Sequence, residues 1–482
     1  MFAVIGGNDM ENNVENKTEN GMENVAENIE AAAEAAAENT AETAVQKKDW
    51  MPEFLKNIDA ALLKKAGFAL LAGVIAACAA ALLTEEEPIT IRDAKEVTRA
   101  DIVYKDVEAP AAANPDGVVS AEEWAAVYPE IAETMMRNDE NSYAVSYLEE
   151  DPYLVNIYEG YGFAKDYMSA RGHNFCLEDV AATQRPHATA NCLTCKSPNF
   201  TKLVNDQGVG VYSMDFNEVH AQMAESTSCY NCHANEAGHQ GELVVTHSYI
   251  VEALGENMAE IDPVILSCGQ CHIEYYFKPE TKEAYVAYNS KETMTPEAIL
   301  AAFNEMGFSD WTQESTGAHM LKAQHPEMET VLYGKHAAMG MNCADCHMPL
   351  EVSQTDGSVY HSHKWVSPLE NETLLAYCAT CHGDVDMVTF VHNLQDRITA
   401  RETEVGNKLS DFKDALAEAN QSGNWSEEDL DVVRDLYRSA QWYFDFCYVE
   451  NSEGAHNSSL SNECLDTSES IIQQGMEMLT NT

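Results

Sequence analysis

Residues 192–196 read Cys192-Leu193-Thr194-Cys195-Lys196, and the same spacing of two cysteines recurs four more times further along the chain. Each of the later pairs is followed directly by histidine. A C-x-x-C-H run is typical of c-type heme attachment, because the two thiols form thioethers to the porphyrin and the adjacent imidazole is held beneath the iron. The sequence therefore predicts five attached hemes, held in chain order by Cys192, Cys195 and Lys196, by Cys229, Cys232 and His233, by Cys268, Cys271 and His272, by Cys343, Cys346 and His347, and by Cys378, Cys381 and His382.

The same spacing disfavours two other uses of paired cysteines. Zinc ribbons bring their cysteine pairs together at short spacing and do not require histidine after the second cysteine. A disulfide framework would leave the repeated histidine without a reason.

The fold expected from this pattern is mainly α, a multiheme cytochrome c in which helices and loops surround five hemes. The segments between the motifs are too short for much independent folding, so a large part of the core is expected to be porphyrin. Electron-transfer hemes usually have two axial ligands. Sixteen histidines occur in the chain and four lie in the motifs, which leaves twelve from which the second ligands can be drawn.

Lysine after the first cysteine pair changes the chemistry, because an amine must lose its proton before it binds iron and then acts as a pure σ donor. Here the chain resembles the pentaheme, ammonia-forming cytochrome c nitrite reductases, whose active-site heme carries a C-x-x-C-K motif. Residues 145 to 460 share the resemblance. The matching segments are Cys192 to Lys196, Arg171-Gly172-His173, Glu274-Tyr275-Tyr276-Phe277 and Lys322-Ala323-Gln324-His325-Pro326-Glu327.

The resemblance implies an enzyme that reduces nitrite to ammonium with six electrons at the Lys196-ligated heme, in respiratory nitrite ammonification. It also implies a distal pocket made by Arg185, Tyr275 and His325, with Arg185 placed by its position fourteen residues after Arg171. The implied second ligands of the other hemes are His363 for the second, with His361 as a near alternative, His173 for the third, His456 for the fourth and His336 for the fifth.

A calcium ion beside the active-site heme is also implied by the resemblance. Its ligands would be the Glu274 carboxylate, the backbone carbonyls of Tyr275 and Lys322, and the Gln324 side chain. Oxygen donors of this kind suit a hard cation.

The start of the chain indicates export. Residues 1–46 are rich in Ala, Glu and Asn and are expected to be a disordered tail. Residues 47–87 contain Lys64-Lys65 and then an apolar run over 66–83, the order used by export signals. The chain is therefore expected in the periplasm or on the outer face of the cytoplasmic membrane, with the segment cleaved, retained as an anchor or lipidated at Cys78, and Met51 is an alternative start.

The charge balance restricts the partners. The chain has 28 Lys plus Arg against 80 Asp plus Glu, a formal net charge of −52, which opposes binding of nucleic acid. A small anion such as nitrite binds only where local cations overcome this field. The acidic surface suits a basic electron donor, and the resemblance implies a membrane-bound multiheme quinol dehydrogenase or a soluble cytochrome.

Residues 88–384 are expected to form the pentaheme region, and residues 385–482 long C-terminal helices. Apolar residues recur at helical spacing from Val391 to Leu416, and Ser426 is expected to start a second helix after a break at residues 420–424. The resemblance implies that these helices form a homodimer interface. Cys176, Cys447 and Cys464 have no assigned role. A disulfide between Cys447 and Cys464 is possible in an oxidising compartment.

Two alternatives stay open at this point. A pure electron carrier would have two ligands on every iron and no substrate, although the Lys196 motif argues against it. An enzyme with the same pocket could instead act mainly on hydroxylamine, nitric oxide or sulfite, because an open heme beside cationic groups does not define one anion.

Overall fold

The computed structural model describes residues 102, 109–186, 188–234 and 242–480. The chain divides into two compact units, Met1–Lys95 and Glu96–Thr482, and all described residues belong to the second. The predicted tail, the signal or anchor segment with Cys78, and His187 and His239 lie outside the described residues. Within the described residues no helix is long and apolar enough to cross a membrane.

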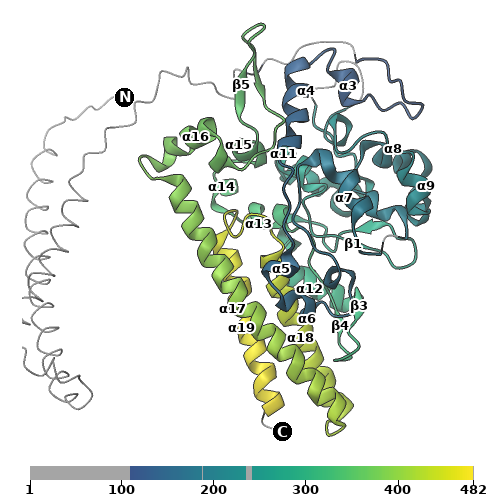
Figure 1. Ribbon diagram of the computed structural model, residues 1–482, viewed down its shortest axis with the longest axis vertical. Helices are drawn as coiled ribbons and strands as arrows, with labels where there is room; N and C mark the ends of the chain where they lie inside the picture. The colour runs from purple at the N-terminus through teal and green to yellow at the C-terminus, as the bar shows by residue number, and fades with distance from the viewer. Residues whose placement is uncertain (1–101, 103–108, 187, 235–241, 481–482) are drawn as a thin grey trace, which may run out of the picture. The chain divides into compact units, whose positions relative to one another are not determined.

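The described part is mainly helical, as predicted, with only short strands (Figure 1). Its strands form three separate two-stranded antiparallel ribbons. These are β1 (Tyr276–Phe277) with β2 (Ala284–Tyr285), β3 (Trp311–Thr312) with β4 (His319–Met320), and β5 (Leu350–Val352) with β6 (Val359–His361).

Short helices make up the region before residue 384. Proline at the first turn starts several of them, and side-chain caps start others, which fits a chain that turns often. The α-helices are α3 (Ala121–Trp124), α4 (Pro129–Met136), α5 (Tyr147–Glu150), α6 (Tyr153–Ile157), α7 (Cys176–Ala182), α8 (Pro198–Gln207), α9 (Phe216–His220), α10 (Ser248–Leu254), α11 (Pro263–Gly269), α12 (Pro296–Glu305), α13 (Glu327–Leu332), α14 (Lys335–Ala338), α15 (Cys343–His347) and α16 (Glu372–His382). The 3-10 turns are η3 (Arg137–Glu140), η4 (Gly162–Ala164), η5 (His173–Phe175), η6 (Ala190–Leu193), η7 (Val209–Ser213), η8 (Cys229–Asn231), η9 (Gly255–Glu260), η10 (Lys291–Thr293) and η11 (Pro368–Glu370).

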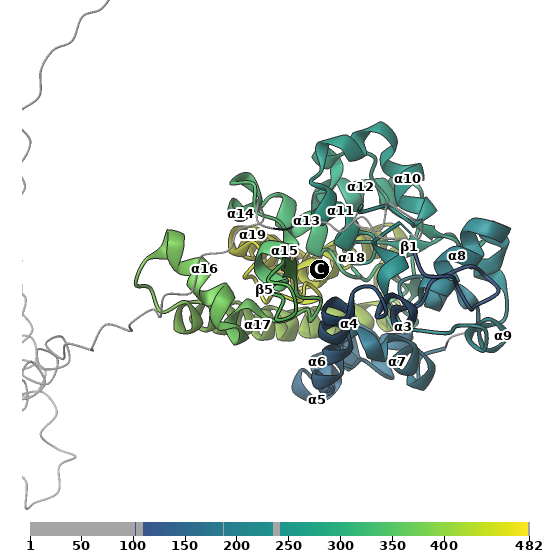
Figure 2. The ribbon, with the colours of Figure 1, turned by 90° about the horizontal axis from the view of Figure 1, so that it is seen from above.

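Three long helices follow, and they pack along one another (Figures 1 and 2). They are α17 (Met387–Ser422), α18 (Glu427–Tyr448) and α19 (Ser458–Thr480). The predicted apolar stripe of α17 is buried from Ile398 to Leu416, and Ser426 caps α18 through the Asp429 N–H, as predicted. The break lies slightly later than expected, because α17 continues to Ser422 and ends at Gly423 with φ of 66°. Helix α19 was not predicted from the apolar pattern.

Close backbone approach explains one glycine of this bundle. A Cβ at Gly475 in α19 would overlap the ring of Phe412 in α17, so glycine lets the two helices approach closely. The Cys447 and Cys464 thiols are buried and not bonded to each other, so the disulfide considered from the sequence is absent. Cys447 Sγ instead donates to Glu402 Oε1 at 3.2 Å.

Buried polar contacts join α18 to the region of short helices. Trp442 Nε1 donates to the Pro296 carbonyl at 2.8 Å, and Tyr158 donates its hydroxyl to Asp445 at 2.6 Å. Arg438 donates to the carbonyls of His319 and Phe308. The bundle is therefore the support against which the ligand-bearing segments are held.

Candidate active site

Each cysteine motif lies in or at the end of a helix or 3-10 turn, which places the first cysteine and the residue four positions later on one side. The His233 N–H donates to the Cys229 carbonyl at 2.8 Å, and the His272 N–H to the Cys268 carbonyl at 3.1 Å. Capping boxes at Ser228 and at Asn342 start two of these turns. The local sequence thus presents two thiols and one imidazole together.

Each motif histidine faces a second histidine from a distant segment. The centres of the paired imidazole rings are separated by 6.0 to 6.2 Å in all four cases. The pairs are His233 with His363, His272 with His173, His347 with His456, and His382 with His336. The structure therefore brings together every pair that the resemblance implied, and His363 rather than His361 faces His233.

The spacing of the pairs fits an iron between two imidazoles. Two metal–nitrogen bonds of about 2 Å each leave about 4 Å between the nitrogens, and about 6 Å between ring centres once the rings are added. Hydrogen bonds at the other nitrogen orient several rings. Nδ1 of His347 lies 2.8 Å from the Val366 carbonyl, and Nδ1 of His363 lies 2.9 Å from the His361 carbonyl. Nε2 is left as the nitrogen that can bind iron.

Burial keeps most of these imidazoles neutral, which iron ligation requires. It lowers the pKa of His173 to about 3 and that of His363 to about 4. Two imidazoles differ: burial would lower the pKa of His272 and of His456, but Glu327 raises the first above its usual value and the adjacent Glu450 raises the second to about 9. Glu450 Oε1 lies 2.5 Å from His456 Nδ1, so a carboxylate orients this ring.

The residues predicted around Lys196 converge from four separate segments. Burial raises the pKa of Tyr275. The thiols of Cys195 and Cys192 raise the pKa of Tyr275 further, and the Arg185 guanidinium lowers it, so these groups lie near one another. Burial also lowers the pKa of His325 to about 4. Tyr275 is thus protonated and His325 neutral near pH 7, and the permanent positive charge of the pocket belongs to Arg185.

His325 lies in the interior, yet 45% of its side chain is accessible, and the same holds for 43% of His272. The two observations agree if the accessible surface faces an internal space rather than bulk solvent. Such a space beside the paired imidazoles is what a porphyrin needs.

The predicted calcium ligands also lie together. Glu274 is buried, its Oε2 accepts the Gln324 N–H at 2.5 Å, and its Oε1 has no hydrogen-bond partner among the described residues. Gln324 Nε2 donates to the Lys322 carbonyl at 2.8 Å. Burial raises the pKa of Glu274 well above its usual value. A buried carboxylate oxygen without a donor, beside a carbonyl and a carboxamide, fits a hard cation.

Comparison with known proteins agrees with this geometry. The family model described as Cytochrome c552 matches residues 120–482. A cytochrome c-552 of Desulfotalea psychrophila is 31% identical over 395 residues, which cover 76% of this chain and 76% of the relative. The chain belongs to the cytochrome c552 family.

The fold of this family member is also that of a solved cytochrome c nitrite reductase. The catalytic subunit from Desulfovibrio desulfuricans, described with two calcium sites, superposes with a TM-score of 0.68 and 24% identity, over 77% of this chain and 88% of that chain. Family membership places the chain among the cytochromes c552, and the shared fold confirms the predicted fold class, a mainly α multiheme cytochrome c.

His247 had no role in the sequence analysis, but the structure places it between the first and third motifs. It is buried, its Nε2 lies 3.0 Å from the Thr194 carbonyl, and its Nδ1 lies 3.1 Å from Gln270 Oε1. With Cys195 and Cys271 it forms a group whose potential ligand atoms lie within 4.8 Å of one another. Both ring nitrogens already face oxygen acceptors, so we interpret His247 as a structural residue that links the first motif, through Thr194, to the third motif, through Gln270.

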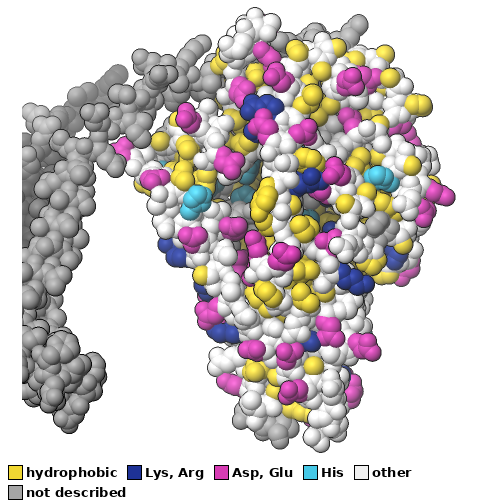
Figure 3. All heavy atoms as spheres, viewed as in Figure 1, with side chains coloured by type: hydrophobic (Ala, Val, Ile, Leu, Met, Phe, Trp, Pro, Cys, Tyr) yellow, Lys and Arg dark blue, Asp and Glu magenta, His cyan; other side chains and the backbone are white. Residues whose placement is uncertain are grey.

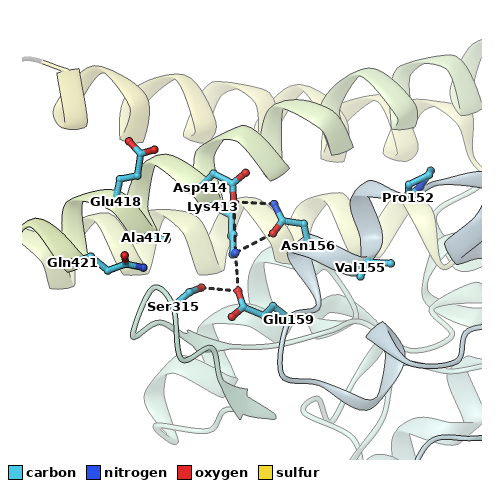
Figure 4. Close-up of a pocket in the computed structure, with 10 residues that line it drawn as sticks. All are labelled: Pro152, Val155, Asn156, Glu159, Ser315, Lys413, Asp414, Ala417, Glu418 and Gln421. Carbon is cyan, nitrogen blue, oxygen red and sulfur yellow. Dashed lines mark hydrogen bonds and ion pairs between the residues drawn. The ribbon is translucent and has the colours of Figure 1, made fainter.

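A surface pocket of 680 Å³ lies between α6 and α17 (Figure 4). Lys413 points into it and binds Glu159 at 2.6 Å and Asn156 Oδ1 at 2.9 Å. None of the residues predicted for heme, calcium or substrate lines this pocket.

Proposed function

We propose that this cytochrome c552 reduces nitrite to ammonium at a heme ligated by Lys196, supplied with electrons through four hemes that each have two histidine ligands. The observation that carries the proposal is the pairing of the imidazoles. Four ring pairs account for all four C-x-x-C-H motifs. The C-x-x-C-K motif instead adjoins Arg185, Tyr275 and His325, which can bind an anion and donate hydrogen bonds.

Ten cysteines, Lys196 and eight paired histidines would hold the five hemes, and the heme held by Lys196 would supply the iron at which nitrite is reduced. Nitrite reduction to ammonium consumes six electrons and eight protons. The chain's own groups bind the anion and supply hydrogen bonds. Arg185 neutralises the negative charge of nitrite, and His325 and Tyr275 donate hydrogen bonds to its oxygens as they become leaving groups.

The calcium ion belongs to the same proposal. Glu274, the carbonyls of Tyr275 and Lys322, and Gln324 would hold it, so its ligands include Tyr275 itself and the residue before it. An ion there neutralises the buried Glu274 and fixes the backbone that carries the Tyr275 hydroxyl.

Export, dimer formation and the electron donor are further parts of the proposal. The apolar run at residues 66–83 would direct the chain to the periplasm or to the outer face of the cytoplasmic membrane, and α17 to α19 would form a homodimer interface. Acidic side chains outnumber basic ones on the face shown in Figure 3, which suits a basic donor such as a multiheme quinol dehydrogenase or a soluble cytochrome.

The first test is an anaerobic assay of the purified holoprotein with dithionite-reduced methyl viologen and nitrite. Ammonium formed in proportion to nitrite consumed would support the six-electron reaction. A protein that carries five hemes per chain and consumes no nitrite would contradict it and favour a pure electron carrier.

A further inference from the structure

The side chain of Arg185 is tied to a threonine that no motif contains. Arg185 lies in the loop between α7 and η6, two residues after Thr183. Thr183 Oγ1 accepts the Arg185 Nε–H at 3.1 Å and the Arg185 backbone N–H at 3.3 Å. One hydroxyl oxygen therefore fixes both the backbone and the guanidinium of this residue.

The hydroxyl of Thr183 is itself oriented by a carboxylate. It donates to Asp166 Oδ2 at 3.0 Å, and the same oxygen accepts the Gln184 N–H at 2.6 Å. Since the proton of Thr183 points to Asp166, its lone pairs face Arg185. Asp166 thus determines the direction of the threonine hydroxyl and holds the loop that leads to Arg185.

An aromatic ring supports Arg185 from another direction. The guanidinium carbon lies 4.3 Å from the centre of the Phe163 ring, within the range of a cation–π contact. Tyr167 packs edge-on against Phe163 with ring centres 4.9 Å apart. A Cβ at Gly162 would lie 3.6 Å from Arg185 Cβ and Cγ, so the stem of Arg185 lies against the backbone here.

Fixing this cation in advance matters in a strongly acidic protein. The formal net charge is −52, and the field of the whole chain repels a small anion. A flexible arginine would have to be ordered each time an anion binds, which weakens binding, whereas an arginine held in place does not. The Nε contact and the ring contact together limit the plane in which the guanidinium can lie.

We propose that Thr183, oriented by Asp166, is a positioning residue that holds the Arg185 guanidinium in the orientation that binds a small oxyanion, with Phe163 as the supporting ring. The inference rests on the proposed function in that it takes Arg185 as the anion-binding group of the pocket. It predicts that the threonine hydroxyl acts on substrate binding and not on heme attachment.

The test compares three holoprotein variants. Thr183→Val removes the hydroxyl, Thr183→Ser restores it, and Thr189→Val makes the same change in the same loop, where the hydroxyl contacts Asn191 at 2.6 Å instead. Optical titration of the oxidised protein with nitrite gives a Kd, and the viologen assay gives KM and kcat. Thr183→Val is expected to raise Kd and KM about threefold to tenfold, with a smaller change in kcat and five hemes per chain. The other two variants are expected to match the wild type.

Unchanged nitrite affinity in Thr183→Val, or an equal loss in Thr189→Val, would overturn the inference. If Thr183→Val attaches fewer hemes, Phe163→Leu takes its place, and an unchanged Kd there would count against the inference in the same way. A wild type that binds nitrite without forming ammonium would contradict the proposed function alone, because the Kd series still decides the role of Thr183.

Discussion

The bundle of α17, α18 and α19 and the region of short helices before it are built on different principles. In the bundle, core side chains such as Leu409, Phe412 and Tyr437 are fully buried against other side chains. In the region of short helices, His272 and His325 lie inside the protein with more than two fifths of their side chains accessible. The bundle core consists of polypeptide alone, whereas the other core has room for groups that the polypeptide does not supply.

The difference indicates where folding free energy comes from in each region. Long amphipathic helices bury apolar surface as they pack, at roughly 25 cal/mol per Å². Helices of four to eleven residues are too short to be stable alone. The region of short helices is therefore expected to gain its stability when the hemes attach, in the way that metal binding and folding are coupled in small metal-binding domains.

The largest expected effect is loss of structure when the full chain is made without heme attachment. Residues 109–384 are then expected to be cleaved about tenfold faster or more in limited proteolysis, while α17 to α19 stay comparatively protected. Mass spectrometry of the fragments locates the cuts. Equal protection of residues 109–384 in the heme-free and holo forms would show that neither region depends on heme attachment for its stability.

The next effect is on activity without loss of structure. His325→Asn replaces the imidazole with a shorter amide that cannot transfer a proton, and it is expected to lower nitrite turnover about 10²- to 10³-fold, with all five hemes attached. His319→Asn is the control, because His319 lies on β4 with Nδ1 2.9 Å from the Thr312 hydroxyl and outside the pocket. Turnover of His325→Asn equal to that of His319→Asn would remove His325 from the mechanism.

The sequence predicted the parts of both regions that depend on local spacing. The motif ligands are four residues apart and share one helical turn, and the apolar stripe of α17 follows the helical period. Thr183 and Asp166 gave no such signal, because their contacts with Arg185 depend on how a loop folds back. One signal was available and missed: Glu402 lies between Ile398 and Val405 on the apolar stripe, a position that predicts burial, and the structure buries it.

Glu402 offers a test of the bundle alone. Burial raises its pKa to about 7, and Glu453, Glu450 and Asp151 add to the rise while the Cys447 thiol opposes it. An acid whose folded pKa lies above its unfolded value stabilises the fold least at high pH, so its contribution is present below pH 4.5 and is lost as pH rises to about 7. Each unit of pKa corresponds to about 1.4 kcal/mol, which gives a loss of about 3 kcal/mol as an upper value.

Glu402→Gln removes that ionisation and is expected to flatten the dependence of unfolding on pH between 4.5 and 7, while nitrite turnover stays unchanged. Denaturant unfolding of the holoprotein, followed by far-UV circular dichroism at several pH values, measures it. The same slope in wild type and variant would show that Glu402 does not titrate over this range.

The smallest expected effect is at the junction of the two regions. Glu450 follows α18 by two residues, is buried, and accepts the Ser452 hydroxyl at 2.5 Å while it lies at the same distance from His456 Nδ1. Nδ1 of His347 and Nδ1 of His363 face neutral carbonyls, and Nδ1 of His272 lies 3.8 Å from Glu327 Oε2, beyond hydrogen-bond distance. A carboxylate at Nδ1 makes the imidazole a stronger electron donor to iron and favours the oxidised state of the iron.

Glu450→Gln is therefore expected to raise the reduction potential of the fourth heme and to leave the potentials of the other four unchanged. Potentiometric titration measures the five potentials, and Glu463→Gln, a change at an exposed residue, is the control. A uniform shift of all five potentials would mean that Glu450 supports the whole fold, and the bundle would then act on the hemes through packing and not through one hydrogen bond.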